Sequence, residues 1–442
     1  MVCALSRLLP QEGNIDMIAL ALERSWMIYL AYFIIVLCFS MIYGRSVRAV
    51  VALCLINNAG VFGLSALICV PLLSATRIDY AALVLAIAID VFCCVLFIKA
   101  GMHIVDFIRS RAGCLSAKTL TIFLLIKVGL FIAIFAASGG QYGIFSEGSR
   151  IDFLRISPQV SRLRYIDDLL SNILMLGIFI KYARTKVFSH YNTFIILAVI
   201  TLSFLTGSKG SAILIVAYSI LFTYAAFPRA FSIRLRLVIV VTMALGSLGY
   251  VYSLSQVLRI DFGDMLTETL SRFVLSADAR LMAFDPGINQ YVLRQPHGSL
   301  LSELFRGIAL LVGARVSEFP FGVYQYEALT GIKSYVGSTS QLSALFVVYG
   351  DGGYYTFCAL TVIVLCAAVT YRCFLKLIRS ADTALGWFAA AALPALLMYF
   401  QGGFDAYPQQ VEVYIVLFFG FVLFRNLQRY NPLLKLPQHF ET

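Results

Sequence analysis

The sequence predicts an all-α, polytopic membrane protein, and three observations carry that prediction. Hydrophobic residues make up 60% of the 442 residues and charged residues only 13%, whereas soluble domains are about 45–50% apolar and about 25% charged. The mean hydropathy of the chain is accordingly high, at +0.87. Apolar runs of about 20 residues recur along the chain, and in hydrocarbon such runs form helices, because a helix satisfies its own backbone hydrogen bonds.

These runs predict about eleven membrane-spanning helices, within a range of roughly ten to fourteen. Barrel strands are excluded, because they would show short segments of alternating hydrophobicity. We expect the spans at Trp26–Tyr43, Ala49–Ser74, Ala81–Ile98, Thr119–Ser138, Asp168–Tyr182, Tyr191–Thr206, Ser211–Phe227, Leu237–Gln256, Gly353–Tyr371, Leu385–Phe400 and Val411–Phe424.

Basic residues occupy every second connection between the expected spans. Because Lys and Arg are retained in short cytoplasmic loops, these connections set the orientation. The alternation predicts an external N-terminus and a cytoplasmic C-terminus. The net charge of +11 has the same origin, so no nucleic acid partner is expected. The predicted cytoplasmic connections include Lys99, Arg109, Arg111 and Lys118; Arg184 and Lys186; Arg229; and Arg372, Lys376 and Arg379.

The chain reads as a single transmembrane domain, residues 1–442, with two long connections on the external side. Loops at about 139–167 and 257–352 are expected to form a periplasmic cap. Within the second loop, Met265–Phe284 and Leu300–Val316 carry apolar residues at helical spacing. Both are predicted to be helices in or against the outer interface, and the second could be re-entrant.

Two charged residues lie well inside expected spans, away from the span ends, where charges are costly and therefore candidates for function. Asp90 and Lys127 are in consecutive antiparallel spans, each about 12 Å from the cytoplasmic end at the rise of an α-helix. Because their depths match, we interpret them as a structural ion pair. A proton relay is the alternative, but it would need more ionisable neighbours.

Two Gly-rich external motifs carry candidate anion-binding residues. Arg150 lies among glycines in the first external loop, and its planar guanidinium suits phosphate or carboxylate groups. In the turn 205–211, Lys209 stands at the opening of a helix, where free backbone N–H groups and the helix dipole favour an anion. The alternative for the turn is a tight connection with a snorkelling lysine. For the first loop, Arg155, Arg162 and Arg164 could instead anchor lipid headgroups or pair with Asp152 and Asp167.

The long external segment interleaves basic and acidic residues. Arg272 and Arg280 are eight residues apart, so on one helix they project within about 80° of each other and form a basic edge. With Arg315 they extend the candidate anion site. A histidine and several carboxylates could supply a general base, although internal salt bridges would also account for most of these charges. The candidate catalytic residues are Glu147, Asp278, His297 and Glu318.

Three motifs together resemble a known family. A polar, Ser/Thr-rich stretch, Gly337–Ser343, leads through an aromatic and Gly-rich step, Tyr349–Gly353, into an expected span. This pattern resembles the late region of bacterial repeat-unit polymerases of the O-antigen polymerase (Wzy) type. Gly148-Ser149-Arg150 and Gly207-Ser208-Lys209 are similar to the basic, Gly-rich external motifs of that family, in which Arg often stands at the position of Lys209.

The resemblance implies a GT-C-like fold and a glycosyltransferase of the bacterial inner membrane whose active site faces the periplasm. It implies that a growing glycan leaves undecaprenyl pyrophosphate and joins a new lipid-linked repeat unit. Arg150, Lys209, Arg272, Arg280 and Arg315 are then the expected pyrophosphate-binding residues. The expected partners are undecaprenyl-pyrophosphate-linked glycans and membrane lipids, and a chain-length-regulating membrane protein is a further candidate. No zinc-type or clustered-carboxylate motif occurs on the external side, so neither a metal nor another cofactor is expected.

Two alternative functions remain open. An O-antigen ligase has the same chemistry but should carry a more distinct His motif than the one around His297. A lipid-linked oligosaccharide flippase would have a similar number of helices. It should, however, line its cavity with charges from several spans and needs no long external cap.

Overall fold

The computed structural model describes residues 80–140, 158–206, 209–232, 261–264, 286–318, 321–330, 348–350, 353–380, 382–401 and 412–420, with single positions besides. Within this part of the chain every regular element is a helix and there are no strands. The predicted all-α class is confirmed for these residues. The first, second and eighth expected spans lie outside them, apart from isolated positions.

Seven expected spans coincide with described helices. Their bounds are α5 Tyr80–Ser110, α6 Ala117–Ala137, α8 Pro158–Thr185, α9 His190–Leu205, α10 Lys209–Ala226, α19 Tyr354–Arg379 and α20 Thr383–Gln401. Helical residues 412–420 fall within the eleventh expected span.

Among the described helices, α6 and α19 are long and apolar enough to cross a membrane. Only 17% and 22% of their most apolar windows are buried, whereas the apolar helix of a soluble core would be mostly buried. Leu125 and Ile132 on α6 and Leu365 on α19 are large apolar side chains that stay exposed. These two helices therefore suggest membrane association, while the number of spans remains a prediction.

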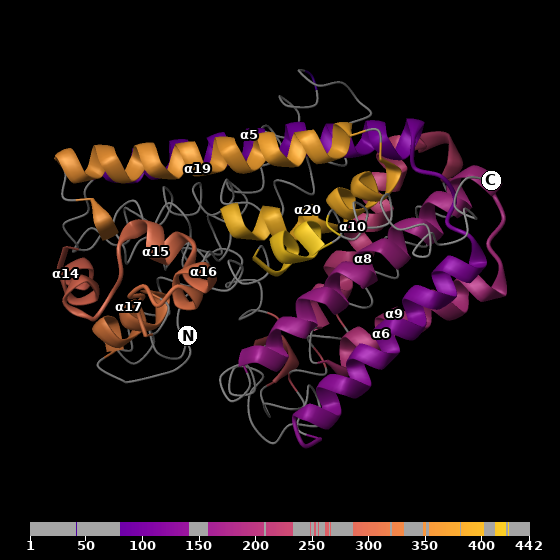
Figure 1. Ribbon diagram of the computed structural model, residues 1–442, viewed down its shortest axis with the longest axis horizontal. Helices are drawn as coiled ribbons and strands as arrows, with labels where there is room; N and C mark the ends of the chain where they lie inside the picture. Colours follow the sequence, from indigo (N-terminus) through magenta and orange to yellow (C-terminus); the bar gives the residue numbers. More distant parts are fainter. Residues whose placement is uncertain are drawn as a thin grey trace.

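Figure 1 shows two groups of helices in the bundle. Along one edge α5 and α19 lie side by side, and α5 also packs against α10 and α20. In the other group α8 packs against α6, α9, α10 and α20. The approach of α20 to α5 is close, because a Cβ atom on Gly386 would lie 2.2 Å from the Phe107 ring. Trp387 packs edge-on against the same ring.

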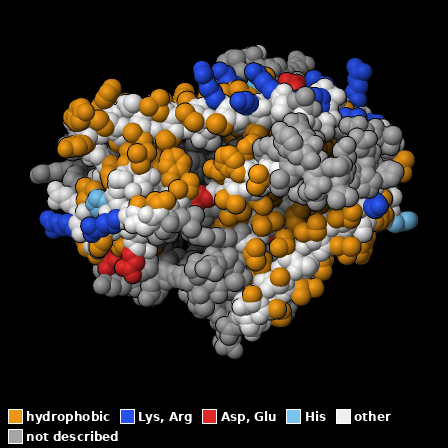
Figure 2. Space-filling view, in the orientation of Figure 1, with side chains coloured by type: hydrophobic (Ala, Val, Ile, Leu, Met, Phe, Trp, Pro, Cys, Tyr) orange, Lys and Arg blue, Asp and Glu red, His pale blue; other side chains and the backbone are white. Residues whose placement is uncertain are grey.

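Helices α5, α8, α10 and α19 all end at the same end of the bundle, which we term the basic end. There Arg109 donates to the last two carbonyls of α10, and Arg111 donates to carbonyls at the end of α19. Arg184 donates to the Ile108 carbonyl, at the end of α5. These carbonyls have no partner within their own helix, and cations are favoured beside them by the helix dipole. Figure 2 shows basic side chains gathered there.

A proline inside α20 is accommodated by two neighbouring helices. Pro394 has no N–H to donate to the carbonyl of Ala390. Instead, the Tyr218 hydroxyl on α10 donates to that carbonyl at 2.7 Å, and Asn172 on α8 donates to the Ala391 carbonyl at 3.0 Å. Both side chains are buried. The carbonyl that Pro394 leaves without a backbone donor is thus satisfied by a buried side chain, as helices in an apolar environment require.

Some helix bounds differ from the predicted ones. Helix α8 begins at Pro158 rather than Asp168, so residues 158–167, expected in an external loop, are helical. Helix α5 continues to Ser110. Hydropathy falls at polar residues, whereas a helix continues as long as its hydrogen bonds and packing do. The expected helix Met265–Phe284 lies almost wholly outside the described residues.

The expected helix Leu300–Val316 is wrong in detail. It consists of two short helices, α15 Leu300–Leu304 and α16 Arg306–Leu311, with a break at Phe305. The second helix ends in a Schellman turn: Gly313 has φ +70°, and the Ala314 N–H donates to the Ala309 carbonyl at 2.7 Å. Two further cap helices, α14 Pro286–Arg294 and α17 Phe321–Thr330, were not predicted.

Candidate functional site

The described part of the cap is a compact group of short helices near the start of α19 (Figure 1). Helix α14 packs against α17, and the kinked pair α15 and α16 lies beside them. Ser299 caps α15 by accepting the Ser302 N–H. The segment before α15 is pressed against the segment after α16, because a Cβ atom on Gly298 would lie 2.0 Å from the Arg315 carbonyl oxygen.

A buried carboxylate joins these two segments. The Glu303 side chain is 2% exposed, and its Oε1 accepts the N–H of Gly298 at 3.0 Å and that of Ser317 at 2.5 Å. Its Oε2 accepts the Ser317 hydroxyl at 2.9 Å. A buried carboxylate that accepts several hydrogen bonds holds its partners in one geometry, because any lost bond leaves a buried charge less satisfied.

Arg306 completes this cluster from the other side. Its Nη1 lies 3.5 Å from Glu303 Oε2 and donates to the Ser317 hydroxyl at 2.7 Å. Its Nη2 donates to the Ser317 and Glu318 carbonyls. The residues 315–318 are therefore held on both sides by charged groups, and Glu303 and Arg306 serve the architecture of the cap.

The position of His297 follows from this arrangement. Its Nδ1 lies 2.8 Å from the Gly298 carbonyl oxygen, and because a carbonyl only accepts, Nδ1 carries the proton. In the neutral ring Nε2 is then the unprotonated nitrogen. The Tyr349 hydroxyl donates to the same carbonyl at 2.8 Å, and its ring stands edge-on to the imidazole. Burial, and after it the charge of Glu303, raises the pKa of Tyr349, so the hydroxyl remains a donor.

Two more candidates lie on the same loop. Arg315 and Glu318 are exposed, and the backbone of Arg315 touches that of Gly298, beside His297. Within the described structure the Arg315 guanidinium makes no hydrogen bond or ion pair. The structure therefore brings together the segments that carry His297, Arg315 and Glu318. Figure 2 shows charged side chains and a histidine grouped over α14 and α15.

The other candidates are placed only in part. Lys209 is the first residue of α10, so the Gly-rich turn does open a helix as predicted. Its side chain lies outside the described residues, so its position relative to the cap stays a prediction. Outside the described residues lie Glu147, Arg150, Arg272, Asp278 and Arg280.

Lys127 has a described partner on α8. Its Nζ lies 2.7 Å from both carboxylate oxygens of Asp167 and 2.8 Å from the Ser171 hydroxyl. Helix α6, which carries Lys127, packs along α8. We expected Asp90 on α5 to be the partner; the Asp90 side chain lies outside the described residues, so that pairing stays a prediction. Asp167 is the carboxylate that the described structure places against Lys127.

A second charge pair continues this buried group along α8. Arg164 and Asp168 are one helical turn apart and attract each other electrostatically, and Arg164 also interacts with Asp167. Lys127 and Arg164 thus face Asp167 and Asp168, and the four formal charges balance. This is the pairing that the sequence raised as the alternative role for Arg164, so these cations are engaged by carboxylates.

Sequence reasoning missed Glu303 and Asp167 as organising residues. A signal for Glu303 was available, since it stands alone among Leu300, Leu301, Leu304 and Phe305, where an acid is either costly or bonded. Within the described residues, no three metal-ligating side chains come together, and metal-independent chemistry remains a prediction.

Comparison of the whole chain with models of protein families, with curated proteins and with solved structures finds no match. The functional assignment therefore rests on the motifs and on the geometry of the cap.

Proposed function

We propose that this chain is a membrane glycosyltransferase that polymerises undecaprenyl-pyrophosphate-linked repeat units into a surface polysaccharide of the O-antigen kind. It would act at the periplasmic face of the bacterial inner membrane. The observation that carries the proposal is in the cap. The Nδ1 of His297 bonds to the Gly298 carbonyl, so Nε2 is the nitrogen of the neutral ring that can accept a proton, and Arg315 is exposed on the segment packed directly against it. The motifs around Arg150, Lys209 and Tyr349 add the resemblance to the polymerase family.

The chemistry needs two functions that these side chains supply. The acceptor sugar hydroxyl attacks the anomeric carbon of the donor, and its proton passes to His297 Nε2 acting as general base. The bond from the anomeric carbon to the pyrophosphate oxygen breaks, and negative charge develops on undecaprenyl pyrophosphate. Guanidinium and ammonium groups stabilise that charge in place of a metal ion. Arg315 is the described candidate for this role, and Arg150, Lys209, Arg272 and Arg280 are the further candidates.

The two alternative functions make different demands on the chain. A flippase would be favoured by charged side chains that line an open path for the glycan. Lys127, however, is completely buried and bound to Asp167, so this pair supports helix packing. The ligase alternative shares the donor chemistry and differs in the acceptor. Only a measurement of products separates it from a polymerase.

Deletion of the gene tests the proposal directly. We expect lipid A core that carries a single repeat unit, seen as loss of the ladder of long chains on a lipopolysaccharide gel. Loss of all repeats, with units stranded on the outer leaflet, would identify a ligase instead. Repeats stranded on the inner leaflet would identify a flippase.

The cap geometry is tested by three variants in the deletion strain. His297→Gln removes the base, and Arg315→Ala removes the guanidinium, so both should shorten the polysaccharide to one or a few repeats at unchanged protein level. Arg294→Ala is the matched control, because Arg294 is an exposed arginine in the last turn of α14. Long chains in all three variants would remove the cap from the active site.

A further inference from the structure

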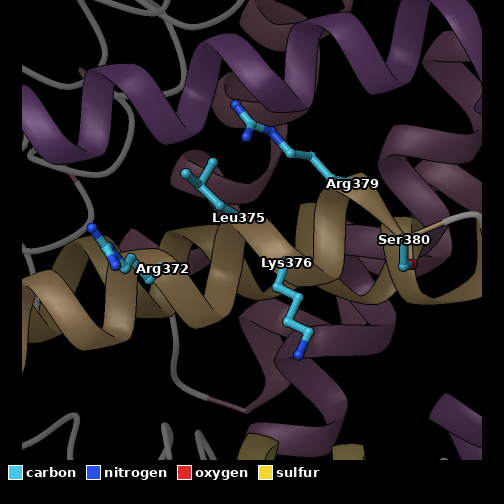
Figure 3. A pocket seen from close by; sticks show the side chains of 5 residues that line it. All are labelled: Arg372, Leu375, Lys376, Arg379 and Ser380. Atoms are coloured by element: carbon cyan, nitrogen blue, oxygen red, sulfur yellow. The ribbon is translucent and has the colours of Figure 1, made fainter.

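A cavity of about 670 Å³ opens on the last turns of α19, at the basic end of the bundle. Among the described residues its lining comes from α19 alone: Arg372, Leu375, Lys376, Arg379 and Ser380. Figure 3 shows Arg379 reaching from α19 toward α5, whereas Lys376 extends away from α5. These cationic side chains line the cavity at the end of α19 that is far from the cap.

The cations of this cavity differ from the other basic residues at the same end. Arg109, Arg111 and Arg184 donate to carbonyls at helix ends, and Lys186 donates to the Arg229 carbonyl. The charged groups of these four side chains are thus already bonded to backbone carbonyls.

In contrast, Arg372 and Lys376 make no hydrogen bond or ion pair within the described structure, and both are exposed. Arg379 has one contact there, at 3.3 Å to Nε2 of His103 on α5. Among the described residues the cavity is thus lined by three basic side chains without an ion pair; a described carboxylate nearby, Asp106 on α5, lies beside His103. Such a site attracts an anion, and guanidinium groups match the oxygens of a phosphate.

The surface next to the cavity indicates what carries the phosphate. Leu365, Val369, Arg372, Lys376 and Arg379 follow one another at helical spacing on one face of α19. Leu365 and Val369 are 58% and 59% exposed. Val369 lies three residues before Arg372, so about 4.5 Å along the helix separates an apolar surface from a cationic one. An anionic phospholipid has the same order, acyl chains followed by a phosphate headgroup.

We propose that this cavity binds the phosphate of an anionic phospholipid in the leaflet at the basic end, with the acyl chains lying on the exposed apolar face of α19. The proposal does not depend on the glycosyltransferase function, because it concerns the other end of the molecule. If the three cations served only to set the orientation of α19 in the membrane, their charge would suffice and no lipid would have to bind.

Lipid retention by the full-length protein tests the proposal. The purified protein is reconstituted with equal amounts of phosphatidylglycerol and phosphatidylcholine, exchanged into detergent, and the bound lipids are identified by native mass spectrometry. We expect wild-type protein to retain phosphatidylglycerol preferentially. In Arg372→Ala, Lys376→Ala, Arg379→Ala triple variants retention should fall about fivefold for each cation removed.

The control triple variant, Lys118→Ala, Lys181→Ala, Arg229→Ala, removes the same charge from the same end, but from side chains that do not line the cavity and have no described hydrogen-bond partner. Equal loss of lipid in both triple variants would overturn the proposal, because total charge would then explain retention. If the cavity triple variant fails to fold, Lys376→Ala alone suffices, since this side chain is exposed and makes no described contact.

A second arm separates lipid phosphate from free phosphate. Inorganic phosphate is titrated against the retained phosphatidylglycerol in wild-type protein. Retention unaffected by millimolar phosphate supports a lipid site in which the apolar face contributes. Displacement at those concentrations would overturn the lipid assignment and identify a site for a soluble phosphate compound.

Discussion

The ammonium of Lys127 lies 2.7 Å from both carboxylate oxygens of Asp167, and the two side chains are 0% and 5% exposed. This pair ties α6 to α8, which also pack through apolar side chains such as Leu120, Leu124 and Leu174. Removing one partner leaves the other as a buried, unpaired charge, which is far more costly than losing the pair as a whole.

We therefore predict opposite behaviour of the single and double variants at this pair. Lys127→Met or Asp167→Leu alone should destabilise the protein by about 3–5 kcal/mol, whereas the double variant should be near neutral. Unfolding by SDS titration in mixed micelles measures both. Equal destabilisation by the single and double variants would show that the pair is not buried as described.

Glu303 should control the order of the cap. Glu303→Gln removes the charge that faces Arg306 and can satisfy only part of the three described donors, so we expect faster hydrogen exchange across residues 297–318. Glu318→Gln is the matched control, because it changes an exposed carboxylate of the same loop and should be within about 0.5 kcal/mol of wild type. Similar exchange in the two variants would contradict the role of Glu303.

Two glycines should respond to alanine in opposite ways. In Gly386→Ala the new Cβ would lie 2.2 Å from the Phe107 ring, which is fully packed between α5 and α20, so we expect a loss of stability of about 1–3 kcal/mol or more. Gly129→Ala on α6 has no atom within 4 Å of the new Cβ and should be neutral or stabilising by up to about 1 kcal/mol. The same SDS titration compares them, and a tolerated Gly386→Ala would mean that the helices are further apart.

Tyr218 and Pro394 should be coupled, because they meet at the Ala390 carbonyl. Tyr218→Phe leaves that buried acceptor without its donor and should cost about 1–3 kcal/mol. In a Pro394→Ala background the new backbone N–H can serve the carbonyl, so the same substitution should cost much less. A double-mutant cycle gives the coupling free energy, and additive effects would show that the hydroxyl does not replace the missing bond.

The spans were predictable where an apolar run is uninterrupted and is bounded by a helix-capping residue. Helix α6 was expected at Thr119–Ser138 and lies at Ala117–Ala137, after the Ser116 cap. Helix α8 was placed too late, because Arg164 and Asp167 lower the hydropathy of its first turns. The charge of Asp167 is compensated by Lys127, which is 40 residues away in the chain, and hydropathy is a local property.

The site was less predictable than the spans, for the same reason. His297, Arg315 and Glu318 were identified as candidates from residue type and side of the membrane alone. The carboxylate that holds their segments together, Glu303, acts through residues 5 and 14 positions away. The proline at the start of α14 was an available helix signal that periodicity alone did not use.

The arginines at the basic end have a consequence for biosynthesis. Arg109 and Arg111 leave the ribosome with α5, yet the carbonyls that they bind lie 116 and 269 residues later in the chain. Until α10 and α19 have been synthesised, both guanidinium groups must be satisfied by water or lipid headgroups. This end of the bundle therefore closes late, and a chain that stops before α19 retains one arginine without its final acceptor.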